Sequence, residues 1–344
     1  MTSATDPQAA DHVPSLVFAC PFCTSMLTGS LSCHACGRDY SHCNGIYRFL
    51  LPERSEAIQS FLSQYRLVRN SEGYHSRPAQ YYRSLPHTDP LDPQAQIWRV
   101  RAETFEHLLR QVLGHSGHYS ATSLPASSQH GGSSQPRRGA TILSNVESDR
   151  TGAPLDVLDI GAGNGWLSHR LAALGHRCVA LDCSDDAEDG LGAFVQYSVP
   201  FTCVQADFDQ LPFAHHQFNI VIFNASLHYS ADIQATLHHA HNMLLPGGAL
   251  VVMDSPTFWY VTGAQSMLTE QAARLRAQSG APQLVIQGVG YTTADALVTA
   301  GQHLGVQFRF APSRGSANWA LRRFLAGLKR RREPASFGLW YGFT

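Results

Sequence analysis

From residue 154 onward, short apolar runs alternate with stretches in which apolar residues recur every three to four positions. A short apolar run bounded by turn residues predicts a buried strand, and a period near 3.6 predicts an amphipathic helix. Strands are expected at 155–160, 177–182, 201–207, 218–224, 249–254, 306–311 and 337–343. Helices are expected at 166–174, 233–244, 293–304 and 317–332. This alternation predicts an α/β fold, a mostly parallel seven-stranded sheet covered by helices on both faces.

We assign residues 154–344 to this α/β domain. By composition, the residues that precede it divide into four parts. Residues 1–15 are small and polar and predict a disordered tail. Residues 16–52 hold five of the eight cysteines and predict a small module of their own. Residues 53–113 read as a helical segment, and 114–153 is rich in Ser and Gly. The last stretch offers too little apolar surface to offset its ordering entropy, which predicts a flexible linker or insertion.

The charge of the chain excludes two broad classes of protein. Only 15% of the 344 residues are charged and the net charge is −1, so the chain is neither a strongly cationic nucleic-acid-coating protein nor an acidic disordered one. The sequence contains no run of about 20 apolar residues and no basic-then-apolar N-terminus, so neither a membrane span nor a secretory signal is expected. These features predict a cytoplasmic protein, in which clustered cysteines bind metal more often than they form disulfides.

Four cysteines are spaced as two Cys-x-x-Cys pairs, nine residues apart: Cys20, Cys23, Cys33 and Cys36. Two such pairs can place four thiolates around one tetrahedral zinc ion. Four thiolates fill the coordination sphere, so the predicted zinc would be structural and would hold a module too small to build much core. The alternative is that these cysteines form a redox-active pair or are unrelated buried thiols. Further residues that could serve as zinc ligands are His34, His42 and Cys43.

A glycine-rich turn follows the first predicted strand of the C-terminal domain, at Gly161-Ala162-Gly163-Asn164-Gly165. Glycines there let the backbone approach a ligand, and the following helix N-terminus favours a negative group. Asp182 ends the next strand, 21 positions after Gly161, which suits a carboxylate that accepts ribose hydroxyls. Trp166 stands where a dinucleotide-binding turn would need its third glycine, so that cofactor class is disfavoured.

The segment 157–165 resembles the first motif of class I S-adenosylmethionine-dependent methyltransferases of the type 11-like kind. Four further segments resemble later motifs of that family in the same order: 180–182, 205–213, 218–229 and 244–250. The resemblance covers about 154–255 and implies a Rossmann-like doubly wound fold that binds S-adenosylmethionine. The segment 45–52 also resembles the end of small zinc-ribbon proteins that partner methyltransferases, so the N-terminal module is expected to be zinc-ribbon-like.

The resemblance implies a role for each matching position. The cofactor-binding residues that it implies are Asp159, Gly161, Ala162, Gly163, Asn164, Gly165, Asp182, Asp207, Phe208 and Asn224. The turn would contact the methionine part, Asp182 the ribose and Asp207 with Phe208 the adenine, and Asn224 would lie near the sulfonium. His228 and Tyr229 follow the fourth strand where an acceptor would approach, and His228 is a candidate base. On the N-terminal side, the residues that could close over the cofactor, or else be ordinary helix-face and loop residues, are Tyr81, Tyr82, Trp98, Arg99 and Arg101.

The acceptor is left open by the sequence. The segment after the fourth strand resembles that of small-molecule methyltransferases, and it has no Asn/Asp-Pro-Pro-aromatic motif of the kind expected for methylation of base amines. A small-molecule acceptor is therefore the first expectation. An RNA base methyltransferase that uses the zinc module and the Arg-rich helix at 317–332 is the alternative. A non-catalytic protein that keeps the cofactor pocket is the third.

Overall fold

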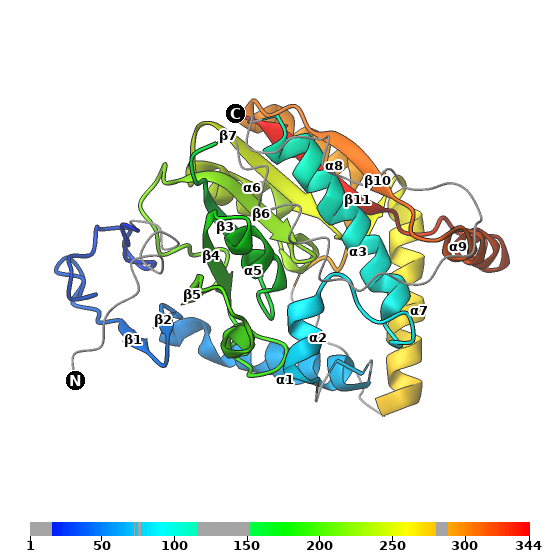
Figure 1. Ribbon diagram of the computed structural model, residues 1–344, viewed down its shortest axis with the longest axis horizontal. Helices are drawn as coiled ribbons and strands as arrows, with labels where there is room; N and C mark the ends of the chain where they lie inside the picture. The colour runs from blue at the N-terminus through cyan, green and yellow to red at the C-terminus, as the bar shows by residue number, and fades with distance from the viewer. Residues whose placement is uncertain (1–15, 72, 75–76, 116–151, 280–287) are drawn as a thin grey trace.

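The computed structural model describes residues 16–71, 73–74, 77–115, 152–279 and 288–344 (Figure 1). The predicted tail at 1–15 and nearly all of the predicted linker at 114–153 lie outside the described residues. The helices are α1 (Ser55–Ser71), α2 (Ala79–Ser84), α3 (Ala95–Leu108), α5 (Trp166–Ala173), α6 (Ile233–Asn242), α7 (Val261–Ser279), α8 (Ala294–Leu304) and α9 (Ala317–Arg330). The strands are β1 (Ser41–Cys43), β2 (Ile46–Arg48), β3 (Asp156–Ile160), β4 (Arg177–Asp182), β5 (Thr202–Gln205), β6 (Phe218–Asn224), β7 (Leu244–Met253), β8 (Thr257–Phe258), β9 (Thr292–Thr293), β10 (Arg309–Ser313) and β11 (Phe337–Phe343).

Nine of these strands form one sheet in the order β1-β2-β5-β4-β3-β6-β7-β11-β10. Neighbours from β2 to β7 are parallel, whereas β11 lies antiparallel between β7 and β10. The predicted α/β fold with a mostly parallel, doubly wound sheet is confirmed. Seven of the strands come from the predicted C-terminal domain, and the hairpin β1-β2 adds two more at one edge.

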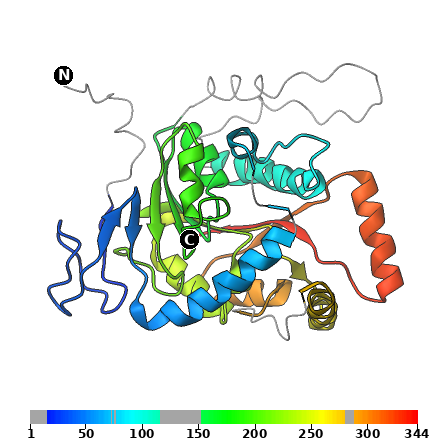
Figure 2. The same cartoon turned by 90° about the horizontal axis from the view of Figure 1, so that it is seen from below.

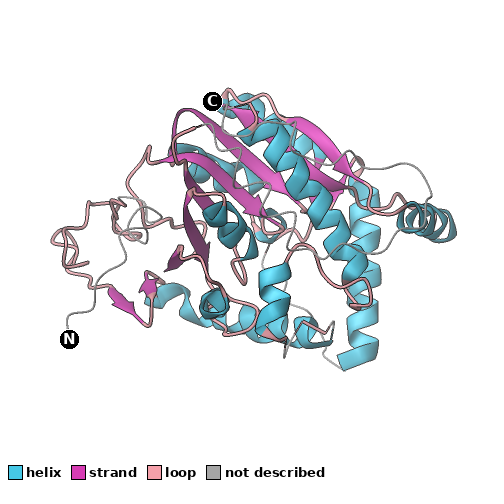
Figure 3. Cartoon of the chain, in the orientation of Figure 1, coloured by secondary structure: helices cyan, strands magenta, loops and turns pink. Residues whose placement is uncertain are grey.

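Helices cover both faces of the sheet (Figure 3). Side chains of β3 alternate between two apolar cores, with Val157 in one and Leu158 in the other. The first core includes residues of α3 and α5, and the second includes residues of α6 and α8. Because β3, β4, β6 and β7 are parallel, their carboxyl ends meet at one edge of the sheet. Parallel α/β sheets bind their ligands at this edge.

The Cys-rich segment is joined to the domain by main-chain hydrogen bonds. In β2, Ile46 lies opposite Cys203 of β5 in parallel register. The Ala19 amide also donates to the Pro212 carbonyl, at 3.1 Å. Figure 2 places this segment and α9 at opposite ends of the molecule. The module thus extends the sheet, and the boundary at residue 52 stays a prediction.

Several elements differ from the sequence expectations. Strand β10 spans Arg309–Ser313, where a strand over 306–311 was expected, because its pairing with β11 runs from Arg309 to Ser313. Strand β5 is shorter than the expected 201–207. Strand β7 starts at Leu244 and runs through Pro246-Gly247-Gly248, where the sequence indicated only the end of a helix. The strand tolerates these residues because its pairing with β6 shifts register between Phe218 and Ile220, at an irregularity. Helix α7 was not anticipated, since its residues carry no clear apolar periodicity. Among the described helices, none combines the length and apolar character that a membrane span requires.

Candidate functional site

The glycine-rich turn has the backbone that its sequence requires. Gly161, Gly163 and Gly165 have φ of +70°, +54° and +77°, in the left-handed region that favours glycine. A Cβ on Gly161 would lie 2.3 Å from the Cβ of Ser226, so this position also requires glycine for space. The turn therefore brings β3 against the loop that follows β6.

Asp182, at the end of β4, is held by this turn. The Gly163 amide donates to its Oδ2 and the Ser184 amide donates to its Oδ1, each at 2.8 Å. Burial raises the pKa of Asp182 to about 6 in spite of these two hydrogen bonds. Each carboxylate oxygen retains a lone pair, so the group can still accept hydrogen bonds from a ligand.

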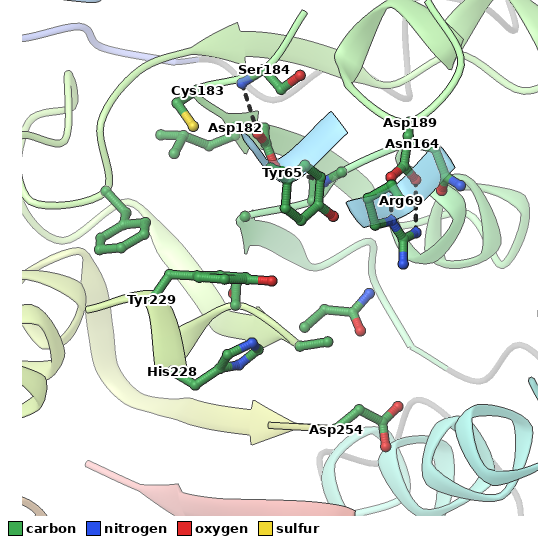
Figure 4. Close-up of a pocket in the computed structure, with 18 of the residues that line it drawn as sticks. Tyr65, Arg69, Asn164, Asp182, Cys183, Ser184, Asp189, His228, Tyr229 and Asp254 are labelled. Atoms are coloured by element: carbon green, nitrogen blue, oxygen red, sulfur yellow. Dashed lines mark hydrogen bonds and ion pairs between the residues drawn. The ribbon is translucent and has the colours of Figure 1, made fainter. Parts of the chain in front are cut away.

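A cavity of about 270 Å³ lies at this edge of the sheet (Figure 4). Nine of the predicted cofactor-binding and catalytic residues line it: Gly161, Ala162, Gly163, Asn164, Asp182, Phe208, Asn224, His228 and Tyr229. The Oδ1 atom of Asn224 is buried there with no hydrogen-bond partner in the described part of the chain. A buried acceptor without a partner is costly unless a ligand satisfies it, so Asn224 points to a bound polar group.

Three of the predicted cofactor residues do not line this cavity. Gly165 forms the N-cap of α5, and Asp159 is buried beneath the turn, where the Ser168 hydroxyl donates to it at 2.9 Å. Asp207 forms an ion pair with Arg54, at 2.7 Å. The role of Asp207 toward adenine stays a prediction, and Arg54 is a partner that the sequence did not reveal.

The N-terminal helices close the cavity from the side opposite the sheet. Helix α1 contributes Phe61, Leu62, Tyr65 and Arg69, and α3 contributes Trp98 and Arg101. The Arg69 guanidinium binds Asp189 of the loop after β4, with Nη2 2.9 Å from Oδ1. This ion pair ties α1 to the cofactor side of the cavity.

Some of the residues that close the cavity were expected from the sequence, and others were not. The sequence singled out Trp98 and Arg101 together with Tyr81, Tyr82 and Arg99 as residues that could close over a cofactor. The last three do not line the cavity, and the Tyr81 hydroxyl instead accepts a hydrogen bond from Trp98 Nε1, at 2.8 Å. Nothing in the local sequence of α1 marked Tyr65 or Arg69.

Asp254, directly after β7, is a polar group of the cavity that sequence reasoning missed. Its side chain is 5% exposed, and Thr104 of α3 donates to its Oδ1 at 2.6 Å. Its Oδ2 is buried with no hydrogen-bond partner in the described residues. Burial raises its pKa to about 6, although the positive charge of Arg101 acts in the opposite direction. Its position directly after a buried strand was the only available signal.

His228 and Tyr229 lie together on the cavity wall, with ring centroids 4.2 Å apart. The Nδ1 of His228 is 3.4 Å from the Ser255 hydroxyl. Burial, helped by the charge of Arg101, lowers the pKa of His228 to about 3. The imidazole is therefore neutral near pH 7 and is a weak base.

The two Cys-x-x-Cys pairs come together in space. The sulfurs of Cys20, Cys23, Cys33 and Cys36 all lie within 4.8 Å of one another. The Sγ atoms of Cys20 and Cys36 are 3.7 Å apart, and those of Cys23 and Cys33 are 3.4 Å apart. Tetrahedral zinc with Zn–S bonds of about 2.3 Å separates its sulfurs by about 3.8 Å, so the arrangement fits such an ion.

Comparison with known proteins relates the region of the site to methyltransferases. Residues 158–252 match the model of the methyltransferase domain family. A malonyl-acyl-carrier-protein O-methyltransferase of Hahella chejuensis is 32% identical over 112 residues, which are 31% of this chain and 38% of that protein. A demethylmenaquinone methyltransferase of Corynebacterium urealyticum is 37% identical over 106 residues, 30% of this chain and 44% of that protein.

Another relative carries a different name. The mitochondrial arginine-hydroxylase NDUFAF5 of Homo sapiens is 30% identical over 115 residues, 33% of this chain and 32% of that protein. The chain spans between 32% and 58% of the length of the first three curated relatives. The similarity is therefore confined to this region, and the reaction of the whole protein is left to be proposed.

Solved structures resemble the chain at low identity. A magnesium protoporphyrin IX methyltransferase of Synechocystis with bound SAH has a TM-score of 0.44 at 14% identity, covering 85% of this chain and 97% of that one. A phosphoethanolamine N-methyltransferase of Haemonchus contortus in complex with S-adenosyl-L-methionine has a TM-score of 0.39 at 14% identity, covering 56% and 49%.

Proposed function

We propose that this protein is an S-adenosylmethionine-dependent methyltransferase that acts on a small molecule. The observation that carries the proposal is the cavity in which the glycine turn, Asp182 and Asn224 meet, within the region that matches the methyltransferase domain family. The Oδ1 of Asn224 has no hydrogen-bond partner there among the described residues. Trp166 is 2% exposed and lines the same cavity at the start of α5. Its ring occupies the place where a dinucleotide pyrophosphate would need a glycine, which disfavours a nicotinamide or flavin cofactor.

The residues present fit S-adenosylmethionine. Asp182 would accept the ribose hydroxyls, and Phe208 would pack on the adenine. Asn224 would receive a polar group of the methionine part. When bound, the cofactor supplies an electrophilic methyl group on a sulfonium. The residues from α1 and α3 exclude water from the cavity, which favours alignment of the acceptor with that methyl group.

On the acceptor side, we propose Asp254 as the group that receives the acceptor's proton. Its buried Oδ2, which has no hydrogen-bond partner in the part of the chain that the structure describes, matches a hydroxyl or amine donor on the substrate. A pKa of about 6 lets the carboxylate be ionised at pH 7 and still bind a proton in the transition state. His228, with a pKa near 3, is less suited to this role and is proposed to contact the acceptor together with Tyr229.

Calorimetry with S-adenosylmethionine tests the cofactor part of the proposal. Asp182→Asn should weaken binding by about ten- to a hundredfold, because the amide cannot make the charge-assisted hydrogen bonds of the carboxylate. Asp185→Asn is the matched control: its residue lies on the same loop but pairs with Arg48 outside the cavity, and it should bind like the wild type. Absence of binding in the wild-type protein, or equal affinity of Asp182→Asn, would refute the proposal.

Transfer of a labelled methyl group to small hydroxyl and amine compounds tests the acceptor part. Asp254→Asn should lower kcat while the affinity for S-adenosylmethionine is kept, and it should remove a rise in rate between about pH 5 and 7. Tight cofactor binding without transfer to any compound would instead favour a non-catalytic protein. Transfer to RNA alone would replace the small-molecule acceptor by the RNA alternative.

For the Cys-rich module we propose one structural zinc ion bound by Cys20, Cys23, Cys33 and Cys36. Metal analysis of the purified protein should give one zinc per chain. Cys36→Ser should lose the zinc and loosen the module. Cys43→Ser is the control, since Cys43 is exposed and lies outside the cluster, and it should keep the zinc. Retention of a full equivalent of zinc by Cys36→Ser would rule out the four-thiolate site.

A further inference from the structure

Helix α9 presents its apolar face to solvent. Leu321, Phe324, Leu325 and Leu328 follow the i, i+3, i+4, i+7 pattern of a single helix face. Their exposed fractions are 56%, 61%, 53% and 62%. A surface helix ordinarily buries such an apolar stripe against the core. Here no other segment of the described residues covers the stripe, which marks it as a candidate interaction surface.

The opposite face of α9 is the one that meets the protein. Trp319, Arg323 and Ala326 are half-buried on that side. The guanidinium of Arg323 lies over the ring of Phe337, at 5.4 Å from its centroid. The helix therefore meets the protein through Trp319, Arg323 and Ala326, whereas its four leucine and phenylalanine side chains project outward.

The charge of α9 has one sign. Its fourteen residues include Arg322, Arg323, Lys329 and Arg330 and no Asp or Glu. Arg330 is bound to Glu270 of α7, at 3.0 Å, whereas the exposed Lys329 follows directly on the apolar Leu328. A helix with an exposed apolar face and basic residues beside it has the composition of a helix that lies in the surface of an anionic lipid bilayer.

The helix also lies next to the active-site cavity. Phe337, which Arg323 contacts, is a residue of the cavity wall at the start of β11. Figure 2 shows α9 at the outer edge of the molecule, where a flat surface can reach it. A surface that binds α9 would therefore come close to the cavity.

We propose that α9 docks the protein on an anionic membrane surface, with Leu321, Phe324, Leu325 and Leu328 buried in the lipid interface and the exposed Lys329 at the head groups. RNA is disfavoured as the occupant because the centre of the exposed face is apolar. A symmetric contact between two α9 helices is disfavoured because it would bring the two Lys329 side chains close together, and α9 itself carries no Asp or Glu that could pair with them. The proposal concerns docking alone and does not depend on the methyl-transfer reaction.

Sedimentation of the full chain with vesicles tests this proposal. The wild-type protein should bind vesicles of phosphatidylcholine with 30% phosphatidylglycerol, and should bind pure phosphatidylcholine less. Phe324→Ser/Leu325→Ser should weaken binding at least tenfold, because each apolar side chain is worth about a factor of ten in transfer from water. Lys329→Glu should weaken binding to the anionic vesicles only. Val195→Ser, at a residue that is 65% exposed on another surface, is the control and should bind normally.

Because all these side chains are exposed, the variants should keep the circular dichroism spectrum and melting temperature of the wild type. Absence of vesicle binding by the wild-type protein, or unchanged binding by Phe324→Ser/Leu325→Ser, would overturn the proposal. So would a wild-type dimer without vesicles that this double variant makes monomeric. Binding to RNA or to an acidic protein that depends on Lys329, with no binding to either vesicle, would also overturn it.

Discussion

Replacing Gly161 by alanine should destabilise the protein for two separate reasons. The backbone at Gly161 has φ of +70°, and an alanine in the left-handed region costs about 1–2 kcal/mol. The added Cβ would also lie 2.3 Å from Ser226 Cβ and 2.8 Å from Ser226 Oγ, a clash that costs about a further 1–3 kcal/mol. The expected loss in the free energy of unfolding is about 2–5 kcal/mol.

Gly163→Ala is the matched comparison. Its φ is +54°, but the nearest atom to an added Cβ is the Asp189 carbonyl oxygen, at 3.8 Å, an ordinary contact. Only the conformational cost of about 1–2 kcal/mol applies there. Urea unfolding without cofactor, followed by circular dichroism, should therefore show a smaller loss for Gly163→Ala than for Gly161→Ala.

A second substitution separates the steric part from the conformational part. Ser226→Gly should cost stability in the wild-type background, because the Ser226 hydroxyl donates to the Ile160 carbonyl, at 2.5 Å. In the Gly161→Ala background it should cost less or restore stability, since it removes the clashing Cβ. Additive effects of the two substitutions, or equal losses for the two alanine variants, would refute this reasoning.

Three further outcomes follow from the ionisable groups. Arg54→Ala should lower the free energy of unfolding measured in urea by only about 1 kcal/mol, because Arg54 is 40% exposed and solvent screens its ion pair with the buried Asp207. An unchanged free energy of unfolding would contradict a structural role for the pair. Burial raises the pKa of Asp159 from 3.8 to about 7, so the free energy of unfolding should fall as pH rises from about 4 to 7 and the buried carboxyl ionises. Between pH 5 and pH 8, the free energy of unfolding should therefore fall less in Asp159→Asn than in the wild type. An equal fall in the two proteins would contradict this assignment. The imidazole of His228 should stay neutral down to pH 5 in an NMR titration, whereas a midpoint near 6.5 would mean that water reaches the ring.

Much of the C-terminal fold could be predicted because its signals are local. Strands β4, β6 and β11 have the predicted bounds, since each is an apolar run with turn residues at its ends. The glycine turn was equally visible, because only glycine readily adopts its positive φ values. Strand β7 was placed five residues late because its irregular pairing with β6 depends on a residue far away in the sequence.

The candidate site could be predicted only in part. Residues on the turn and at strand ends were found, since parallel strands bring their carboxyl ends to one edge. Tyr65, Arg69 and Asp254 were not found, because their place in the cavity depends on how α1 and α3 pack against the sheet. The same holds for Asp207, whose ion pair with Arg54 joins residues 153 positions apart.

By itself, the sequence determined most strands and helices of the C-terminal domain, the glycine-rich turn and the four-cysteine set, because periodicity, backbone freedom and short spacing act over a few residues. Only the tertiary structure decided that the hairpin β1-β2 extends the main sheet and that the Oδ2 of Asp254 lies in the cavity with no hydrogen-bond partner among the described residues. It also decided that the apolar face of α9 points away from the protein. These features depend on contacts between distant segments, and a helical pattern alone specifies which residues share a face but not what that face meets.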